Sequence, residues 1–269
     1  MLDLTERFSF EGHGIAWGRL GAGPPLVMVH GTPFSAQVWR RIAPLMAARR
    51  TVYLFDLLGY GQSDMPDGDV SLGVQNRLLA ALFAHWGLER PDMLAHDFGG
   101  ATVLRAYYLD GLRYGRLTLI DPVAVRPWGS PFVTHVRVHE AAFAGMPDYV
   151  HAAVLEAYLQ TASHRGLDAE AVDVYARPWR GAVGKPAFYR QIAQMDQSYT
   201  DEVEGRYGAL DCRVTLLWGA EDQWIPLDTG KRVAELLRPD RFHTIPNAGH
   251  LVQDDAPEAI VSALLSEAA

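Results

Sequence analysis

Short apolar runs alternate with longer amphipathic stretches along most of the chain. The runs are rich in β-branched residues and bounded by turn-forming residues, which is typical of buried strands, whereas the stretches have the period of helices. After an opening hairpin (7–20), the predicted strands are residues 25–31, 51–56, 92–96, 116–121, 213–219 and 241–246. The predicted helices are residues 37–48, 71–86, 98–110 and 227–237, with a last one from residue 256. This alternation predicts an α/β fold with a mostly parallel central sheet flanked by helices.

The alternation stops between residues 123 and 207. This segment has no convincing strand, and its helical stretches are interrupted by dipeptides such as Met146-Pro147, Arg165-Gly166 and Lys185-Pro186. Proline and glycine punctuate helices, so several short helices are expected. We therefore predict a core domain formed by residues 1–122 and 208–269, with a helical cap (lid) domain inserted at residues 123–207.

Composition and charge narrow the classes of function. The 269 residues are 49% hydrophobic, and 24 basic against 32 acidic side chains give a formal net charge of −8. A chain without a broad basic field is not expected to bind nucleic acid or anionic membranes. No apolar run is long enough to span a bilayer, and the first ten residues do not resemble a secretory signal. The single cysteine, Cys212, fits a reducing compartment, so we expect a cytoplasmic protein; the oligomeric state stays open.

Four polar motifs follow predicted strands. They are HGTPF (30–34), HDFGG (96–100), WGAEDQW (218–224) and PNAGHL (246–251). In open α/β sheets, ligands bind beyond the carboxyl ends of the strands, so these motifs are expected to meet at one site. An acid on a strand–helix turn, then a second acid, then a histidine is the order of nucleophile, acid and base in one large class of hydrolases.

These motifs resemble the α/β-hydrolase superfamily over nearly the whole chain, and DLLGYGQSD (56–64) resembles a glycine-rich loop of that family. Serine enzymes of the family carry G-x-S-x-G, whereas the matching stretch here (95–99) is AHDFG, with Asp97 in place of serine. An aspartate there resembles the epoxide hydrolases and the haloalkane and fluoroacetate dehalogenases. The resemblance implies an α/β-hydrolase fold and a hydrolase that needs no cofactor and no metal.

A carboxylate is already ionised at neutral pH and can attack an sp3 carbon that bears a leaving group. Asp97 would then form an alkyl-enzyme ester, and His250 would activate the water that hydrolyses it. Asp222 would orient the imidazole, while the backbone N–H groups of Thr32 and Phe98 would form the oxyanion hole.

Each of these roles has an alternative. Asp97 could simply cap the helix that follows it, a common position for aspartate. Asp121, at the end of an earlier strand, is an alternative to Asp222 as the acid that orients His250. His135 and His139 have the i, i+4 spacing of metal ligands, but the sequence shows no clear third ligand, and a solvated or cap-lining pair is favoured.

The leaving group is less well defined. In epoxide hydrolases, cap tyrosines protonate the nascent alkoxide, and AFYRQ (187–191) resembles such a cap motif; Tyr189 is therefore the first candidate, with Tyr149 as the second. Dehalogenases of both kinds carry an N–H donor directly after the nucleophile, where this chain has Phe98. A halide donor would have to come from elsewhere, and the candidates are Trp128, Trp179 and Trp224.

The sequence thus favours an epoxide hydrolase-like enzyme whose partners are a small apolar organic substrate and water. A haloalkane or haloacid dehalogenase is the main alternative. An ester or lactone hydrolase and a catalytically silent binding protein rank lower. The first would require carboxylate attack on an ester, and the second has no need of three catalytic residues.

Overall fold

The computed structural model describes residues 1–266 around one eight-stranded sheet of order β1-β2-β4-β3-β5-β6-β7-β8. The strands are β1 (Glu6–Phe10), β2 (His13–Leu20), β3 (Pro25–Val29), β4 (Thr51–Phe55), β5 (Asp92–His96), β6 (Arg116–Ile120), β7 (Arg213–Gly219) and β8 (Arg241–Ile245). Strands β1 and β2 are antiparallel to each other, and β2 is antiparallel to β4. Every other neighbouring pair is parallel.

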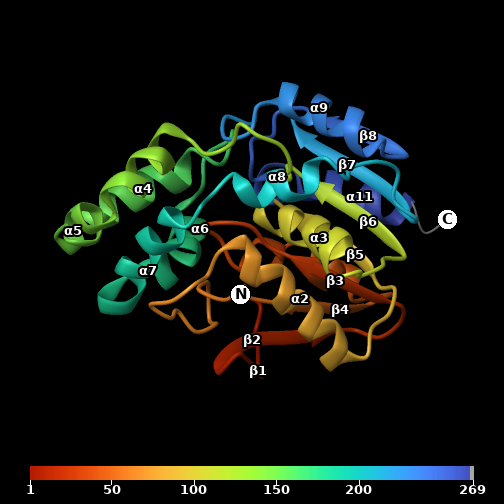
Figure 1. Cartoon of the computed structure of the whole chain (residues 1–269), viewed down its shortest axis with the longest axis horizontal. Coiled ribbons are helices and arrows are strands. Elements are labelled where there is room, and N and C mark those ends of the chain that lie inside the picture. Colours follow the sequence, from red (N-terminus) through yellow and green to blue (C-terminus); the bar gives the residue numbers. More distant parts are fainter. Residues whose placement is uncertain (267–269) are drawn as a thin grey trace.

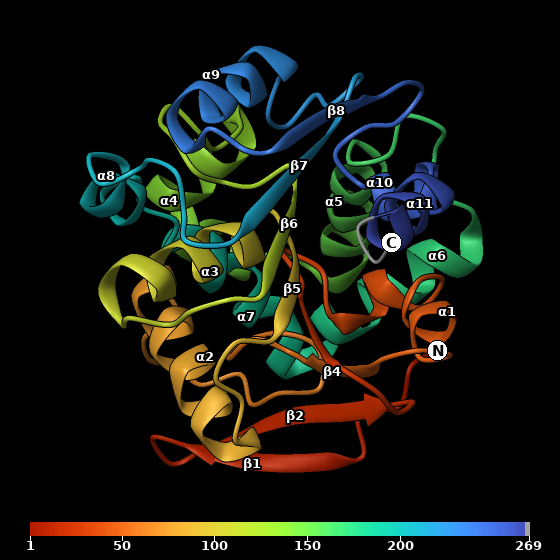
Figure 2. The ribbon, with the colours of Figure 1, turned by 90° about the vertical axis from the view of Figure 1, so that its right-hand side faces the viewer.

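Helices cover both faces of the sheet, which is why strands such as β5 and β7 are almost continuously apolar and buried. Figure 2 shows α2 (Leu72–Trp86), α3 (Phe98–Leu109) and α9 (Leu227–Leu237) on one face. The other face carries α1 (Ala43–Met46), α10 (Val252–Asp255) and α11 (Pro257–Ser266). The α/β fold class predicted from the sequence is therefore confirmed.

The chain between β6 and β7, residues 123–207, is called the cap segment below. Its elements are α4 (Pro131–Ala144), α5 (Asp148–Gln160), α6 (Ala169–Ala176), the 3-10 helix η2 (Arg177–Trp179), α7 (Gly181–Ala193) and α8 (Ser198–Glu204). Figure 1 shows α4 to α7 gathered at one end of the sheet. Among the described residues, no helix has the length and apolar character needed to cross a membrane.

One predicted helix differs from the structure. Residues 37–48 do not form a continuous helix but a 3-10 helix, η1 (Ala36–Trp39), followed by the short α1. Pro44 explains the break, because it has no backbone N–H to donate to the carbonyl four residues earlier, as a continuous helix would require. The helix restarts with Pro44 in its first turn, where the missing N–H costs nothing.

Candidate active site

Asp97 occupies a sharp turn between β5 and α3, with φ 52° and ψ −118°. A positive φ is unfavourable for a residue with a side chain, so the surrounding structure must impose it. The turn is possible because two nearby glycines have no side chain and so leave room for close backbone packing. A Cβ on Gly99 would lie 2.2 Å from the Val29 carbonyl oxygen, and a Cβ on Gly31 would lie 2.4 Å from the Asp97 Cβ. The glycines of HGTPF and HDFGG thus let the two loops approach each other.

The buried carboxylate of Asp97 is held by backbone donors. The N–H of Thr32 donates to Asp97 Oδ1 over 2.7 Å, and the N–H of Phe98 also interacts with the carboxylate. Burial alone would raise the pKa of Asp97, but the hydrogen bond and charge of His250, with the Phe98 N–H, outweigh burial and lower it. The side chain makes no capping hydrogen bond to α3, so the helix-cap alternative is wrong.

His250 lies between two carboxylates. Its Nδ1 is 2.8 Å from Asp222 Oδ2, and its Nε2 is 3.3 Å from Asp97 Oδ2. The other oxygen of Asp222 accepts the N–H groups of Trp224 (2.7 Å) and Ile225 (2.9 Å), which fixes that carboxylate. Burial lowers the pKa of His250, but the charge of Asp222, its hydrogen bond and Asp97 raise it well above its ordinary value. The imidazolium is therefore stabilised at this position.

Asp121, the alternative acid, ends β6 close to the same site. Its Oδ1 accepts the N–H of Gly219 over 2.9 Å, and no hydrogen bond joins it to His250 within the described part of the chain. Burial and the neighbouring charge of Asp222 raise its pKa well above the ordinary range, which favours the protonated carboxyl. The geometry therefore places Asp222, and not Asp121, on His250.

Two buried groups hold the loop that carries His250. The Nε2 of His96 lies 2.9 Å from the His250 carbonyl oxygen, and burial lowers the pKa of His96 to about 3, so the ring is neutral and donates from Nε2. Asp255 accepts the N–H of Gly249 over 2.8 Å. It also accepts hydrogen bonds from three donors of the loop after α5, namely Ser163 Oγ (2.6 Å), His164 N (2.8 Å) and Arg165 N (3.2 Å). Asp255 thereby ties the His250 loop to the cap segment.

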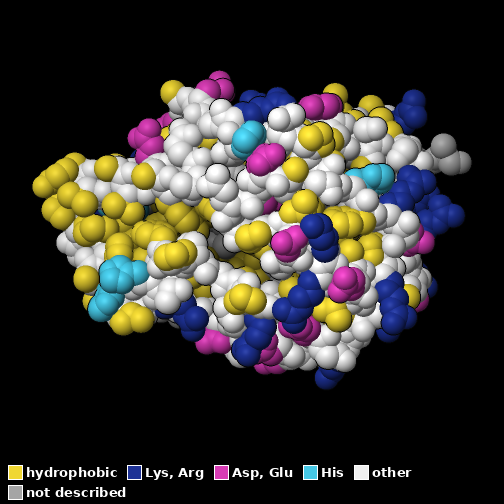
Figure 3. Space-filling view, turned by 90° about the horizontal axis from the view of Figure 1, so that it is seen from above, with side chains coloured by type: hydrophobic (Ala, Val, Ile, Leu, Met, Phe, Trp, Pro, Cys, Tyr) yellow, Lys and Arg dark blue, Asp and Glu magenta, His cyan; other side chains and the backbone are white. Residues whose placement is uncertain are grey.

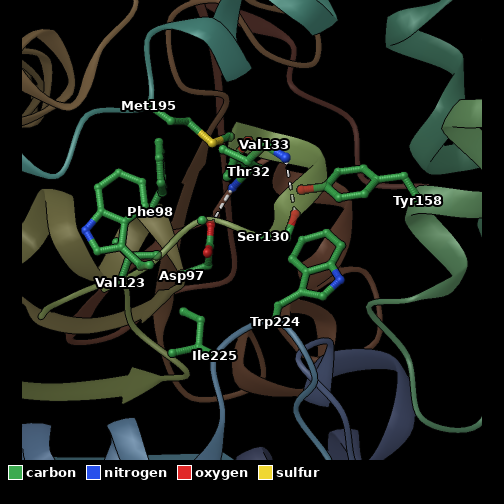
Figure 4. A pocket seen from close by; sticks show the side chains of 12 residues that line it. Thr32, Asp97, Phe98, Val123, Ser130, Val133, Tyr158, Met195, Trp224 and Ile225 are labelled. Carbon is green, nitrogen blue, oxygen red and sulfur yellow. Dashed lines mark hydrogen bonds between the residues drawn. The ribbon is translucent and has the colours of Figure 1, made fainter. Parts of the chain in front are cut away.

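A narrow cavity of about 30 Å³ opens beside Asp97. Its lining is mostly apolar: Thr32, Asp97, Phe98, Val123, Trp128, Gly129, Ser130, Val133, Tyr158, Met195, Trp224 and Ile225. In Figure 4, Phe98, Val123 and Met195 lie on one side of Asp97, and Ser130, Tyr158 and Trp224 lie on the other. Such a cavity suits a small apolar molecule with one reactive polar group.

The three tryptophans expected to supply a halide donor do not have a free indole N–H. Trp128 donates to Thr200 Oγ1 (2.9 Å), Trp179 to the Pro33 carbonyl (2.7 Å), and Trp224 to Thr161 Oγ1 (2.8 Å). Trp128 and Trp224 line the cavity with their rings, whereas Trp179 does not line it. The expectation of a tryptophan halide donor is therefore corrected, because each donor is already used within the protein.

The two tyrosines expected from the sequence are also not at the cavity. The Tyr149 side chain is 78% exposed on α5, and the hydroxyl of Tyr189 is 2.8 Å from His151 Nδ1. Neither residue lines the space beside Asp97, so both assignments are corrected. Tyr189 lies instead in the aromatic packing of the cap, against Phe143 and Phe188.

Tyr158 on α5 is the tyrosine that the structure brings to the cavity. Figure 4 shows its hydroxyl pointing towards the interior of the cavity, and this hydroxyl makes no hydrogen bond to another group of residues 1–266. Burial raises the pKa of Tyr158, and the nearby Asp97 charge raises it further, so the phenol keeps its proton at neutral pH. An unpartnered phenol facing a carboxylate can protonate an oxygen placed between them.

A metal site is not formed among residues 1–266, where no group of three or more potential ligands converges. His135 and His139 do lie together, with ring centroids 4.7 Å apart. They supply only two potential ligands. Both lie on the outer side of α4, where they line a shallow pocket together with Thr134 and Val138. These histidines are separate from the cavity at Asp97.

The comparisons with known proteins agree with this architecture. Residues 26–263 match the model of the alpha/beta hydrolase family, and the chain belongs to that family. The crystal structure of an alpha/beta hydrolase fold protein from Burkholderia ambifaria is 57% identical, with a TM-score of 0.98, and the match covers 99% of this chain and 98% of that one. The protein is thus a hydrolase of the α/β fold.

More distant matches carry specific activities in their names. A 2-hydroxy-6-oxo-2,4-heptadienoate hydrolase from Pseudomonas putida is 26% identical, over 87% of this chain and 85% of that protein. The epoxide hydrolase CorEH is 20% identical with a TM-score of 0.76, over 97% of this chain and 96% of that one. Haloalkane dehalogenases are also among the solved structures of similar fold. At such low identity these structures demonstrate the fold alone.

Proposed function

We propose that this protein is an epoxide hydrolase that works through a covalent ester on Asp97. The single observation that carries the proposal is the placement of two groups across the cavity. An ionised, buried carboxylate at Asp97 faces a protonated phenol at Tyr158. An epoxide needs both, a nucleophile for its carbon and an acid for its oxygen.

In the first step, an oxygen of Asp97 attacks one carbon of the epoxide ring. Thr32 holds Oδ1, which favours Oδ2 as the attacking atom. The C–O bond of the ring breaks, its electron pair stays on the oxygen, and that oxygen takes the proton of the Tyr158 hydroxyl. The product of this step is a β-hydroxyalkyl ester of Asp97 and a phenolate at Tyr158.

In the second step, water attacks the carbonyl carbon of the ester while His250 accepts a proton from the water. Esterification removes the charge of Asp97, which is one of the interactions that raise the pKa of His250, so the imidazolium releases its proton to solvent and the neutral imidazole acts as the base. The N–H groups of Thr32 and Phe98 stabilise the tetrahedral oxyanion. Collapse releases the diol, and the proton on His250 returns through solvent to Tyr158.

The same cavity fits an alkyl halide less well. A departing halide needs polarised N–H donors, and the indole groups of Trp128 and Trp224 are both directed at protein oxygens. Phe98 follows the nucleophile and its side chain has no donor. A phenol is a suitable acid for an alkoxide, so the cavity favours an epoxide over a halide.

Single turnover in 18O-labelled water tests the proposal. With enzyme in excess over styrene oxide, one label should enter the Asp97 carboxylate and the diol should stay largely unlabelled, as measured by peptide mass spectrometry. The His250→Gln variant should accumulate an ester with the mass of enzyme plus epoxide. The matched control is His139→Gln, a surface histidine change that should leave turnover intact.

Two results would contradict the proposal. One is an unlabelled Asp97 after many turnovers of an active substrate, which excludes the covalent route. The other is halide release from haloalkanes with no diol formed from any epoxide in a parallel panel, which would make the enzyme a dehalogenase.

A further inference from the structure

A second, larger hollow lies directly outside the cavity at Asp97. It has a volume of about 450 Å³ between α4, α5 and the loop after β7, and it is lined by Ser130, Pro131, Phe132, Val154, Ala157, Tyr158, Thr161, Gln223 and Trp224. We call it the outer groove. Figure 3 shows that the surface at the cap end of the molecule is strongly apolar and hollowed.

The cavity and the outer groove share one wall. Ser130, Tyr158 and Trp224 line both spaces, and all three lie on the same side of Asp97 in Figure 4. The rings of Tyr158 and Trp224 are stacked, with centroids 4.7 Å apart and planes at 14°. A molecule that reacts between Asp97 and Tyr158 therefore lies directly beside the side chains that also line the groove.

The chemistry of the groove lining defines what it can hold. None of its nine lining residues carries a charge. The Thr161 hydroxyl already bonds the Tyr158 carbonyl and accepts the Trp224 indole N–H, which leaves Gln223 as its main polar side chain. An uncharged alkyl or aryl chain can be buried there at no cost in unpaired polar groups, whereas a carboxylate would lose its hydration without gaining a cation.

On the side of Asp97 away from Tyr158, the cavity is lined by the apolar side chains of Phe98, Val123 and Met195, whereas the larger free space lies on the Tyr158 side, in the outer groove. We propose that the outer groove is the binding site for the unreactive end of the substrate. On this view, which rests on the proposed function, the physiological substrate is an epoxide on an uncharged, elongated apolar chain whose far end passes Tyr158 and lies between α4 and α5.

A series of 1,2-epoxyalkanes from butene oxide to decene oxide tests this inference. In the wild-type enzyme, kcat/KM should rise about two- to fourfold for each methylene that enters the groove. Ala157→Trp fills the groove from an exposed position of α5 and should flatten the rise, so that kcat/KM falls far more for decene oxide than for butene oxide. Val183→Trp is the matched control, because Val183 is 64% exposed on α7, away from the groove lining.

Binding of 1,2-alkanediols separates this inference from the proposed function, because it requires no turnover. In the His250→Gln protein, 1,2-decanediol should bind more tightly than 1,2-butanediol by calorimetry, and Ala157→Trp should abolish the difference. If this result is obtained while no epoxide reacts, the groove is supported as a binding site for apolar chains and the epoxide hydrolase proposal is wrong. If epoxides react but neither kcat/KM nor diol affinity depends on chain length, the groove inference is overturned.

Discussion

The indole ring of Trp224 is stacked on the imidazole of His250, with ring centroids 5.0 Å apart and planes at 28°. The same indole ring is also stacked on the ring of Tyr158, and the backbone N–H of Trp224 donates to the Asp222 carboxylate. One residue of the loop after β7 therefore contacts the candidate base, its orienting acid and the candidate proton donor. This arrangement makes the Trp224 ring part of the electrostatic environment of His250.

Replacing Trp224 tests that contribution. Both Trp224→Phe and Trp224→Leu lose the hydrogen bond to Thr161, but only the leucine variant loses the aromatic face. A stacked aromatic ring stabilises a cation by about 0.5–2 kcal/mol, so the pKa of His250 should fall further in Trp224→Leu than in Trp224→Phe. The pH dependence of ester hydrolysis in single turnover would report this difference. Identical profiles for the two variants would show that the ring acts only by filling space.

The two acids near His250 should respond differently to amide substitution. Asp222→Asn removes the charge that raises the pKa of His250, so the acid limb of hydrolysis should move to lower pH. The rate should also fall by about 10²–10⁴-fold, because an amide cannot hold the required tautomer.

Asp121→Asn is the matched control for this change. The raised pKa of Asp121 favours its neutral form, and an asparagine oxygen can still accept the Gly219 N–H, so turnover should stay close to that of the wild type. A larger loss in Asp121→Asn than in Asp222→Asn would reverse the assignment of the orienting acid.

The tyrosine assignment is tested by a pair of phenylalanine substitutions. Tyr158→Phe should slow alkylation by an epoxide by about 10²–10⁴-fold, since the ring oxygen would leave without a general acid. Tyr189→Phe breaks only the contact with His151, so it should cost about 1 kcal/mol of folding free energy and leave alkylation unchanged. Stopped-flow fluorescence and denaturant titration measure the two effects. A severe alkylation defect confined to Tyr189→Phe would restore the sequence-based choice.

Asp255 should act on the hydrolysis step through the loop that carries His250. Each of its oxygens accepts a backbone N–H, so an asparagine would place its own N–H2 against a donor in either orientation. We expect Asp255→Asn to slow hydrolysis more than alkylation, so that the Asp97 ester accumulates during turnover and is seen by intact-mass spectrometry.

Asp254→Asn provides the comparison for Asp255. The Asp254 carboxylate also ties the core to the cap segment, but its hydrogen-bond partners are Arg40 and Tyr175, not the backbone of the His250 loop. Both variants should be destabilised by about 1–3 kcal/mol, which is the cost of an unsatisfied buried group. Accumulation of the ester in Asp254→Asn to the same extent would show that the effect is general loosening of the cap.

The sequence by itself determined the framework of this protein. Buried parallel strands can be predicted from their continuous apolar, β-branched composition. The loops that follow parallel strands must meet at the carboxyl edge of the sheet. The motifs at Asp97, Asp222 and His250 could therefore be placed together before any coordinates, and the structure brings them within hydrogen-bonding or ion-pair distance. Their local signals are strong because a tight turn needs glycines at fixed positions, as Gly31 and Gly99 show.

The tertiary structure alone decided what faces the carboxylate. Tyr149, Tyr158 and Tyr189 all lie on cap helices, and their relative positions depend on how α5 and α7 pack, which no local pattern encodes. The indole N–H of Trp224 is used by Thr161, a contact between residues far apart in the sequence. Likewise, Asp121 and Asp222 follow neighbouring strands, and only their positions in the folded chain give Asp222 the contact with His250 and give Asp121 a raised pKa through burial and the charge of Asp222. Long-range packing determines such choices because burial and neighbouring charge set both protonation and access.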